Sequence, residues 1–175
     1  MTKILSGELK GRKLKSLSSD FLRPTQAIVR KSIMDSIRNF ENKNILDLFS
    51  GIGSLGIESL SRGAKKVTFV ENSKRVTSIL KHNIDMLNIS NKCEVIYSDV
   101  IKFLKKEDSM YDLIFADPPY GDYNFEELFV YVDPLLKKNG IFCFESNIKF
   151  DTNSIDNIKH KKFGKTNILF WEKIK

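Results

Sequence analysis

The sequence contains few residues that could bind a transition metal or form disulfide bonds. Its 175 residues include two cysteines, Cys93 and Cys143, and two histidines, His82 and His160. The cysteines lie in separate apolar runs, and the histidines stand far apart beside lysines, so no cluster has the spacing of a zinc site. We therefore expect two free, buried thiols, as in a cytoplasmic protein, and no bound metal.

The chain also lacks long apolar stretches. No run approaches the roughly 18 residues that a membrane-spanning helix needs, and the first residues, MTKILSGE, lack the apolar segment of a signal peptide. With 41% hydrophobic and 29% charged residues, the composition is that of a soluble globular protein. The length suits one domain with a substantial core, and we expect the protein in the cytoplasm.

Acidic residues are scarce at the start of the chain. Residues 1–40 hold nine lysines and arginines against three acids, a net charge of +6, whereas residues 41–175 hold 20 against 19. Most of the formal net charge of +7 therefore belongs to this N-terminal extension. A local basic patch favours a polyanionic partner, because cations that neutralise phosphates release counterions. A solvated surface without a partner is the alternative.

From residue 44 the hydrophobic pattern alternates between short apolar runs and helical segments. Apolar runs that suit buried parallel strands lie at 44–49, 66–71, 93–97, 111–116 and 139–145. Helices are predicted between them at 54–62, 73–88, 99–106 and 124–137, with Ser73 capping the second. This alternation predicts an α/β fold with a doubly wound parallel sheet, right-handed crossovers and strand order 3-2-1-4-5.

The two ends of the chain depart from this alternation. Residues 3–15 suit a small β-hairpin, and residues 26–39 suit an amphipathic helix capped by Thr25. Near the other end, an apolar run at 153–160, a turn at 163–165 and a second run at 168–171 predict a closing hairpin.

A glycine-rich segment follows the first predicted strand. It reads DLFSGIGSLG over residues 47–56, and Gly51, Gly53 and Gly56 fit the pattern G-x-G-x-x-G. Glycines between a strand and a helix let the backbone approach a nucleotide or nucleoside ligand. Dinucleotide enzymes and S-adenosylmethionine enzymes both use this pattern, so it does not identify the ligand by itself.

Acidic residues end the next two strands. Glu71 follows Asp47 by 24 positions, near the spacing at which an acid meets the ribose hydroxyls of such a ligand. Its charge would repel a phosphate there, and an ordinary surface acid is the alternative. Asp99 could accept a hydrogen bond from an adenine amine or could cap the following helix, and the two roles do not exclude each other.

The fourth predicted strand runs into Asp117, Pro118, Pro119 and Tyr120. Two prolines cannot continue a central strand, so a rigid turn faces the glycine-rich segment across the point where the strand order reverses. A nucleobase fits this turn, because its exocyclic amine can donate to the Asp117 carboxylate and the Pro118 carbonyl while Tyr120 stacks on the ring. An ordinary turn with a core tyrosine is the alternative.

Together these motifs resemble the RsmD family. The resemblance rests on GELKGRKL at residues 7–14, LRPT at 22–25, DLFSG at 47–51, LSRGA at 60–64 and DPPY at 117–120. Members are bacterial class I methyltransferases that use S-adenosylmethionine to methylate a guanine N2 of small-subunit (16S) ribosomal RNA. The resemblance implies this activity, a Rossmann-like, mostly parallel seven-stranded sheet, an RNA-contacting β-hairpin and helix extension over residues 1–40, and a methyltransferase domain over residues 41–175.

The resemblance also implies roles for individual residues. The S-adenosyl-L-methionine cofactor would be held by Asp47, Phe49, Gly51, Gly53, Glu71, Asn72, Asp99 and Val100. The target guanine would be held by Asp117, Pro118, Pro119 and Tyr120, with Asp117 acting as a base or only as a hydrogen-bond acceptor. Ribosomal RNA, free or within a small-subunit particle, would be contacted by Lys10, Arg12, Lys13, Arg23 and Arg30.

Three other functions stay open on the motifs alone. A DNA adenine-N6 methyltransferase shares DPPY, but it would normally need a larger target-recognition region than the N-terminal extension offers. A dinucleotide-dependent oxidoreductase would need a hydride-transfer acid, and no histidine ends a predicted strand. A non-catalytic RNA-binding module would leave the acids at the strand ends without a role.

Overall fold

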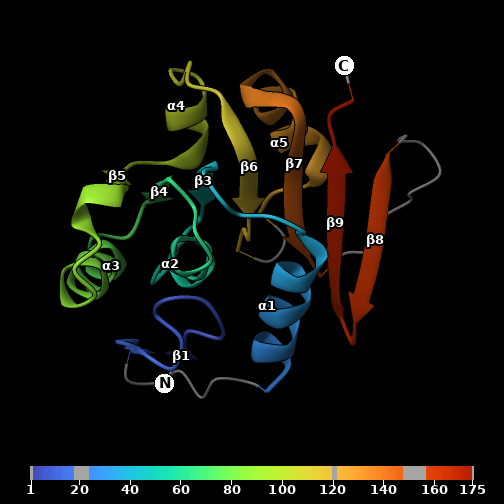
Figure 1. The fold of residues 1–175 in the computed structure, drawn as a ribbon. Helices are drawn as coiled ribbons and strands as arrows, with labels where there is room; N and C mark the ends of the chain where they lie inside the picture. Colours follow the sequence, from blue (N-terminus) through green and yellow to red (C-terminus); the bar gives the residue numbers. More distant parts are fainter. Residues whose placement is uncertain (1, 18–23, 120–121, 148–156, 175) are drawn as a thin grey trace.

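A seven-stranded β-sheet forms the centre of the computed structural model, which describes residues 2–17, 24–119, 122–147 and 157–174 (Figure 1). Its strands are β3 (Asn44–Leu48), β4 (Lys66–Glu71), β5 (Cys93–Tyr97), β6 (Tyr111–Ala116), β7 (Leu136–Ser146), β8 (Ile158–Phe163) and β9 (Thr166–Glu172). Their order is β5-β4-β3-β6-β7-β9-β8. The first five strands in this order are parallel, and β9 and β8 continue the sheet as an antiparallel pair. The predicted fold class and strand order are confirmed.

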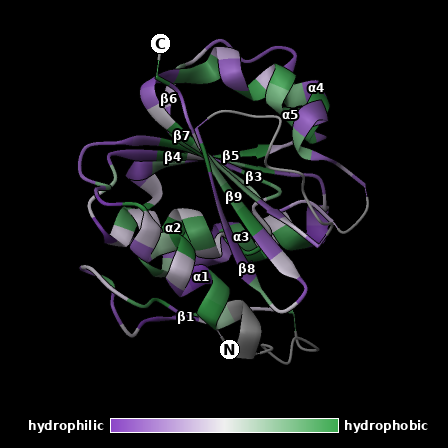
Figure 2. Ribbon diagram, turned by 90° about the vertical axis from the view of Figure 1, so that its right-hand side faces the viewer, coloured by the Kyte–Doolittle hydropathy of each residue, from purple (hydrophilic) through white to green (hydrophobic). Residues whose placement is uncertain are grey.

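Helices cover both faces of the sheet. They are α1 (Pro24–Ser36), α2 (Ser54–Ser61), α3 (Lys74–Met86), α4 (Val100–Leu104) and α5 (Phe125–Val132). Figure 2 shows α1, α2 and α3 on one side of the sheet and α4 and α5 on the other. Alternate residues of the buried strands point to opposite faces, so Ile45 joins one hydrophobic cluster and Leu46 joins the other. None of the described helices is long and apolar enough to cross a membrane.

The N-terminal hairpin shares the core on the α1 side of the sheet. Its two strands, β1 (Thr2–Lys3) and β2 (Lys13–Leu14), pair antiparallel as predicted. Ile4 and Leu14 are 3% and 1% exposed and belong to the same hydrophobic cluster as side chains of α1, α2 and the central strands. The strands of the hairpin are therefore packed against the sheet domain through these two side chains.

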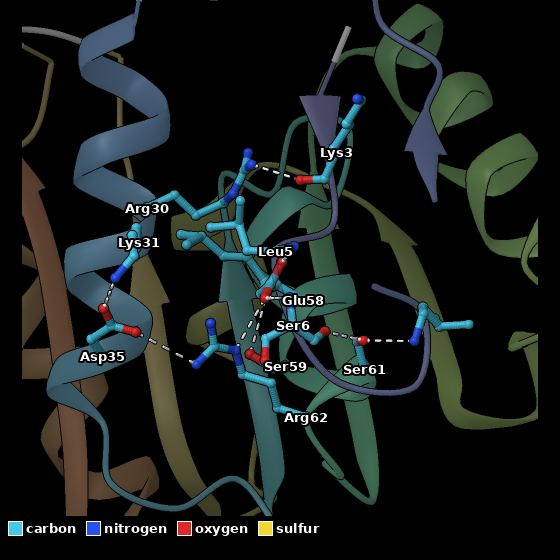
Figure 3. Close-up of polar contacts among 12 residues, drawn as sticks. Lys3, Leu5, Ser6, Arg30, Lys31, Asp35, Glu58, Ser59, Ser61 and Arg62 are labelled. Carbon is cyan, nitrogen blue, oxygen red and sulfur yellow. Dashed lines mark hydrogen bonds and ion pairs between the residues drawn. The ribbon is translucent and has the colours of Figure 1, made fainter. Parts of the chain in front are cut away.

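A buried carboxylate fastens the N-terminal hairpin to α2 (Figure 3). Glu58 is 1% exposed, and its oxygens accept hydrogen bonds from the backbone N–H groups of Leu5 and Ser6 at 2.7 and 3.0 Å. The Arg62 guanidinium donates to the same carboxylate at 3.0 Å. One turn further on, the Ser61 hydroxyl donates to the Ser6 carbonyl. The helix that follows the glycine-rich segment thus carries the hairpin directly.

Two predicted helix boundaries are wrong. The helix predicted at 124–137 ends at Val132, because Pro134 lacks an N–H and its ring blocks a further helical turn. A 3₁₀ turn over Asp133–Leu135 follows, and β7 begins at Leu136 instead of residue 139. The helix predicted at 26–39 is α1, which begins at Pro24, where the fixed φ of proline suits the first helical position. Thr25 therefore lies inside the first turn instead of capping it.

The remaining local predictions mostly hold. Ser73 caps α3, since its hydroxyl accepts a hydrogen bond from the Val76 N–H. The closing hairpin is β8 and β9, joined by a two-residue turn at 164–165, and positions 153–156 of its first predicted run lie outside the described residues. Both cysteines are free; Cys143 is buried as predicted, but Cys93 is partly exposed.

Replacing Glu58 with glutamine should lower the free energy of unfolding by about 1–3 kcal/mol. The amide NH₂ group cannot accept a hydrogen bond, so one of the donors that now bind the carboxylate would lose its acceptor. Urea unfolding followed by circular dichroism measures the change. Glu41→Gln is the matched control, since Glu41 is exposed. Equal stabilities of the two variants would show that the carboxylate does not fasten the hairpin.

Candidate active site

A cavity of about 360 Å³ opens at the carboxyl ends of the central parallel strands. This is the edge at which open α/β sheets bind ligands, next to the point where the strand order reverses at β3. The volume lies within the usual range for small-molecule sites. The cavity is lined by Phe49, Glu71, Asn72, Val100, Asp117, Pro118, Pro119, Asp122 and Tyr123.

The register of the parallel strands explains why acidic residues meet at this edge. Phe69 on β4 and Phe115 on β6 are both in register with Asp47 on β3. Glu71 follows Phe69 by two residues, and Asp117 follows Phe115 by two residues. Both therefore point to the same face of the sheet as Asp47. Two of the acids that the sequence analysis selected from separate strand ends therefore border one cavity, and Asp47 lies just behind them.

Asp47 supports the glycine-rich segment. Its Oδ2 atom accepts a hydrogen bond from the Gly56 N–H at 2.9 Å, and the residue is 2% exposed. Burial raises the pKa of this carboxyl well above its usual range, and the hydrogen bond from Gly56 opposes the rise. The structure shows a support for the loop, and the contact of Asp47 with a cofactor stays a prediction.

The loop itself needs unusual backbone conformations. Phe49, Gly51 and Gly53 have φ values of 55°, 54° and 85°, in the left-handed region that favours glycine. A Cβ atom on Gly53 would lie 2.4 Å from a methyl carbon of Leu80 on α3, so a side chain there would clash as well as strain the turn. Phe49 lines the cavity, whereas Gly51 and Gly53 are not among its lining residues.

Glu71 is held rigidly at the end of β4. Its Oε2 atom accepts a hydrogen bond from the Gly51 N–H at 3.0 Å, and its Oε1 atom accepts one from the Ser73 N–H at 2.8 Å. Each carboxylate oxygen can accept a second hydrogen bond, and Glu71 lines the cavity. The neighbouring Asn72 lines it as well.

Asp99 caps α4. Its Oδ1 atom accepts a hydrogen bond from the Lys102 N–H at 2.9 Å, so the capping role that the sequence left open is confirmed. Val100, the first residue of the helix, lines the cavity, but Asp99 is not among the lining residues. A contact of Asp99 with an adenine stays a prediction.

Asp117 directly follows β6 and precedes the two prolines Pro118 and Pro119. Its surface is open to the cavity, and the next residue, Pro118, is buried. The protein around the remaining sides desolvates the carboxylate and raises its pKa to about 6. Asp117 is therefore largely ionised at neutral pH, and its pKa lies close enough to neutrality for proton transfer. Tyr120 lies outside the described residues.

A second carboxyl group, which the sequence analysis missed, stands beside Asp117. Cys143 on β7 is in register with Phe115 on β6, so Glu145 follows on the same face next to Asp117. Burial, and then the charge of Asp117, raise the pKa of Glu145 to about 8. The pair thus shares one proton near neutral pH. Glu145 could have been found from the sequence, because it is an acidic residue at the end of the strand predicted at 139–145.

Two aromatic rings line the cavity together. The ring centroids of Phe49 and Tyr123 are 4.9 Å apart, and the ring planes are inclined by 51°. Phe49 was predicted as a site residue, whereas Tyr123, in the segment before α5, was not. Aromatic faces of this kind pack against flat heterocycles.

The basic residues predicted to contact RNA fall into two groups. Lys10, Arg12 and Lys13 are exposed on the N-terminal hairpin. Arg23 lies outside the described residues. Arg30 does not stand on the exposed basic surface: it is 8% exposed, donates to the Lys3 carbonyl at 2.8 Å, and burial lowers the pKa of its guanidinium. The structure corrects that prediction, since Arg30 ties α1 to the hairpin (Figure 3).

The chain is similar in sequence to bacterial RNA-modifying proteins. It is 41% identical to the ribosomal RNA small subunit methyltransferase D of Haemophilus influenzae over 67% of this chain and 63% of that protein, so it spans less than two thirds of this relative. It is 33% identical to the protein of the same name from Escherichia coli over 83% of this chain and 72% of that protein.

Solved structures agree with this similarity. A putative methyltransferase from Escherichia coli superposes with a TM-score of 0.88 at 26% identity, covering 99% of this chain and 98% of that one. A family model described as Conserved hypothetical protein 95 matches residues 2–172. The chain therefore belongs to the Conserved hypothetical protein 95 family, together with the ribosomal RNA small subunit methyltransferase D (RsmD) proteins.

Proposed function

We propose that this protein transfers a methyl group from S-adenosyl-L-methionine to the exocyclic N2 amine of a guanine in small-subunit ribosomal RNA. The charge of the cavity carries the proposal. Glu71, Asp117 and Asp122 line it, and none of its described lining residues is a lysine or arginine. An acidic cavity favours a cationic sulfonium nucleoside and disfavours the pyrophosphate of a dinucleotide. The activity named for the relatives supports the same function.

The described residues fit the cofactor, which supplies the methyl group. Backbone N–H groups fix both oxygens of Glu71, and each oxygen keeps a lone pair that can accept a ribose hydroxyl. Asp99 and Val100 would contact the adenine at the start of α4. Asp47, Phe49, Gly51, Gly53 and Asn72 would surround the rest of the molecule.

Asp117 and the Pro118 carbonyl would act on the guanine. The exocyclic amine is a weak nucleophile, because its lone pair is delocalised into the ring. Two acceptors on its N–H groups would favour a more pyramidal nitrogen, with the lone pair aimed at the methyl carbon. As the new N–C bond forms, the bond between the methyl carbon and the sulfonium sulfur would break and leave a neutral thioether. The nitrogen would gain positive charge, and the Asp117 carboxylate would accept one of its protons. The raised pKa of Asp117 suits that role.

The RNA would be positioned by the N-terminal extension. Lys10, Arg12 and Lys13 would contact phosphates and carry little base readout. In this proposal residues 1–40 form the RNA-contacting extension and residues 41–175 form the methyltransferase domain. The enzyme would act in the cytoplasm, on free ribosomal RNA or on a small-subunit particle.

Replacing Asp117 with asparagine should lower kcat by about 10²- to 10⁴-fold, because the acceptor for the proton is lost. Nucleoside mass spectrometry of small-subunit ribosomal RNA treated with the purified protein measures the product, N2-methylguanosine. Calorimetry should show a much smaller change in the affinity for S-adenosylmethionine, because Glu71 and Asp122 keep the cavity acidic. Asp108→Asn, at an exposed residue away from the cavity, is the control. Full activity of the Asp117 variant, or N6-methyladenine as the product of the wild type, would overturn the assignment.

The rate should also fall at low pH. Since the pKa of Asp117 is raised to about 6, kcat/KM for RNA should drop about tenfold per pH unit below that value as the carboxylate is protonated. Glu145→Gln should keep this inflection, because glutamine resembles the neutral form that Glu145 already has there. Single-turnover rates between about pH 5 and pH 8 test both points. A flat profile down to pH 5 would contradict the role of Asp117.

Replacing Lys10, Arg12 and Lys13 together with glutamine should raise KM for RNA without changing kcat. The slope of log affinity against log salt should fall by about two, because each lost phosphate contact removes about 0.7–0.9. Substitution is preferable to deleting residues 1–15, which would also remove Ile4 and Leu14 from the core. The control changes Lys65, Lys105 and Lys106, which are exposed at the opposite edge of the sheet. Equal salt slopes for both variants would reject the contact.

A further inference from the structure

The edge strand β8 and its turn carry a second concentration of positive charge. Lys159, Lys161, Lys162 and Lys165 fall within seven residues, and no acid occurs between positions 157 and 171. The near-neutral balance of residues 41–175 conceals this cluster, because acids elsewhere in the domain offset it. We name these four residues the β8 lysines.

The β8 lysines are available to an external partner. All four are exposed, and none forms an ion pair with a described residue. The acid on α1 that lies toward Lys161 is Asp35, which is already paired with Lys31. Other lysines of the described chain do have acidic partners: Lys66 pairs with Glu94, Lys137 with Asp112 and Lys173 with Asp133.

The topology directs this charge toward the edge that holds the cavity. β7 runs parallel to β6 and antiparallel to β9, and β8 runs antiparallel to β9, so β8 points the same way as β6 (Figure 1). The residues that end β8 therefore lie at the edge where Asp117 follows β6. In register, Lys161 faces Ile168, and Ile168 faces Glu145, the neighbour of Asp117. Three strand spacings separate β8 from β6, about 14 Å.

The alternation along β8 spreads the charge over both sides of the sheet edge. Lys161 is in register with Ile168, whose side chain belongs to the cluster on the α1 face. Lys162 is in register with the next position, Asn167, and so points toward the α5 face. A polyanion that crosses the edge of the sheet can meet lysines on either side of it.

The N-terminal hairpin supplies the other side of the arrangement. Figure 1 shows the hairpin below α2 and β8 at the right-hand edge of the sheet, with α1 and β9 between them. Exposed cations are therefore present on both sides, namely Lys10, Arg12 and Lys13 on the hairpin and the β8 lysines on β8 and its turn. None of them lines the cavity, whose charged lining residues are acidic.

We propose that the β8 lysines bind the phosphate backbone of the substrate RNA on the side of the target base opposite to the N-terminal hairpin. The inference rests on the proposed function, since it assumes that the base in the cavity belongs to an RNA. Lysine contacts of this kind act as point charges on phosphates, so they position the strand without reading its sequence. Two flanking contacts would fix the strand across the cavity, which a single basic patch cannot do.

The alternative is that the lysines only protect an exposed sheet edge. Lysines on edge strands hinder pairing with another chain, and that role needs no RNA. The two roles differ in what substitution changes: loss of a phosphate contact weakens RNA binding and lowers its salt dependence, whereas loss of edge protection promotes self-association.

The test replaces all four β8 lysines with glutamine. The matched control makes the same change of charge at the opposite edge of the sheet, at Lys65, Lys105, Lys106 and Lys138, which are exposed and form no ion pair with a described residue. Fluorescence anisotropy measures the affinity of each protein for a transcript of small-subunit ribosomal RNA at several salt concentrations. Thermal unfolding establishes that both variants are folded.

The β8 variant should bind the RNA at least about tenfold more weakly near physiological salt, with a salt slope lower by up to about three. Its KM for RNA should rise, while kcat and the affinity for S-adenosylmethionine stay as in the wild type. The control should lose much less affinity and slope. Affinity and slope equal to those of the control would overturn the inference, and self-association of the β8 variant would then assign the lysines to edge protection.

Two further outcomes distinguish failure of the RNA contact from failure of the proposed methyltransferase function. If the wild type methylates no guanine but loses RNA affinity on substitution of the β8 lysines, the proposed function fails and the RNA contact survives. If RNA binding is unchanged but binding to vesicles of anionic phospholipid is lost, the lysines serve a membrane surface and the inference fails.

Discussion

Carboxyl groups crowd the carboxyl edge of the parallel sheet, and the organisation of the site depends on how their mutual repulsion is relieved. Asp47, Glu71, Asp117 and Glu145 come from four neighbouring strands and lie on one face. Backbone N–H groups of the glycine-rich segment stabilise Asp47 and Glu71, and burial favours protonation of Glu145. Asp117 keeps its charge open to the cavity. A bound cation would relieve the remaining repulsion, which is why a sulfonium ligand suits the site.

The same elements that hold the acids also hold the N-terminal hairpin. Glu58 on α2 binds its backbone, and Asn83 on α3, which is fully buried, donates to the carbonyls of Lys15 and Ile52. The Asn83 side chain also accepts from the Lys15 N–H at 2.8 Å. Since Ile52 belongs to the glycine-rich segment, one amide connects the end of the hairpin to that segment, although the two are far apart in sequence.

The sequence allowed the strand order and the main acids to be predicted because both follow from local periodicity and from the rule that parallel strands end at one edge. Interactions between distant segments could not be derived in this way. Arg30 looked like part of a basic surface, yet its burial depends on how β1 packs against α1. Asn83 was not selected from the sequence, because its burial depends on the approach of Lys15 and Ile52, whose carbonyls accept from its amide. Three local signals were missed: Pro24 and Pro134, which displaced helix ends, and Glu145 at the end of a predicted strand.

If the protein acts on RNA as proposed, the distribution of charge would select which part of the RNA enters the cavity. Exposed cations lie on the N-terminal hairpin and on β8, whereas the charged residues that line the cavity are acidic. The exposed cations would attract a phosphate backbone over a range set by the Debye length, but the acidic lining would repel the same backbone. A nucleobase carries no net charge, so it could approach Asp117 without this cost. An amine on that base would find an acceptor there, whereas a carbonyl at the same position would find only another acceptor. In the proposed function the arrangement would therefore discriminate first by charge and then by hydrogen-bond polarity, before any sequence is read.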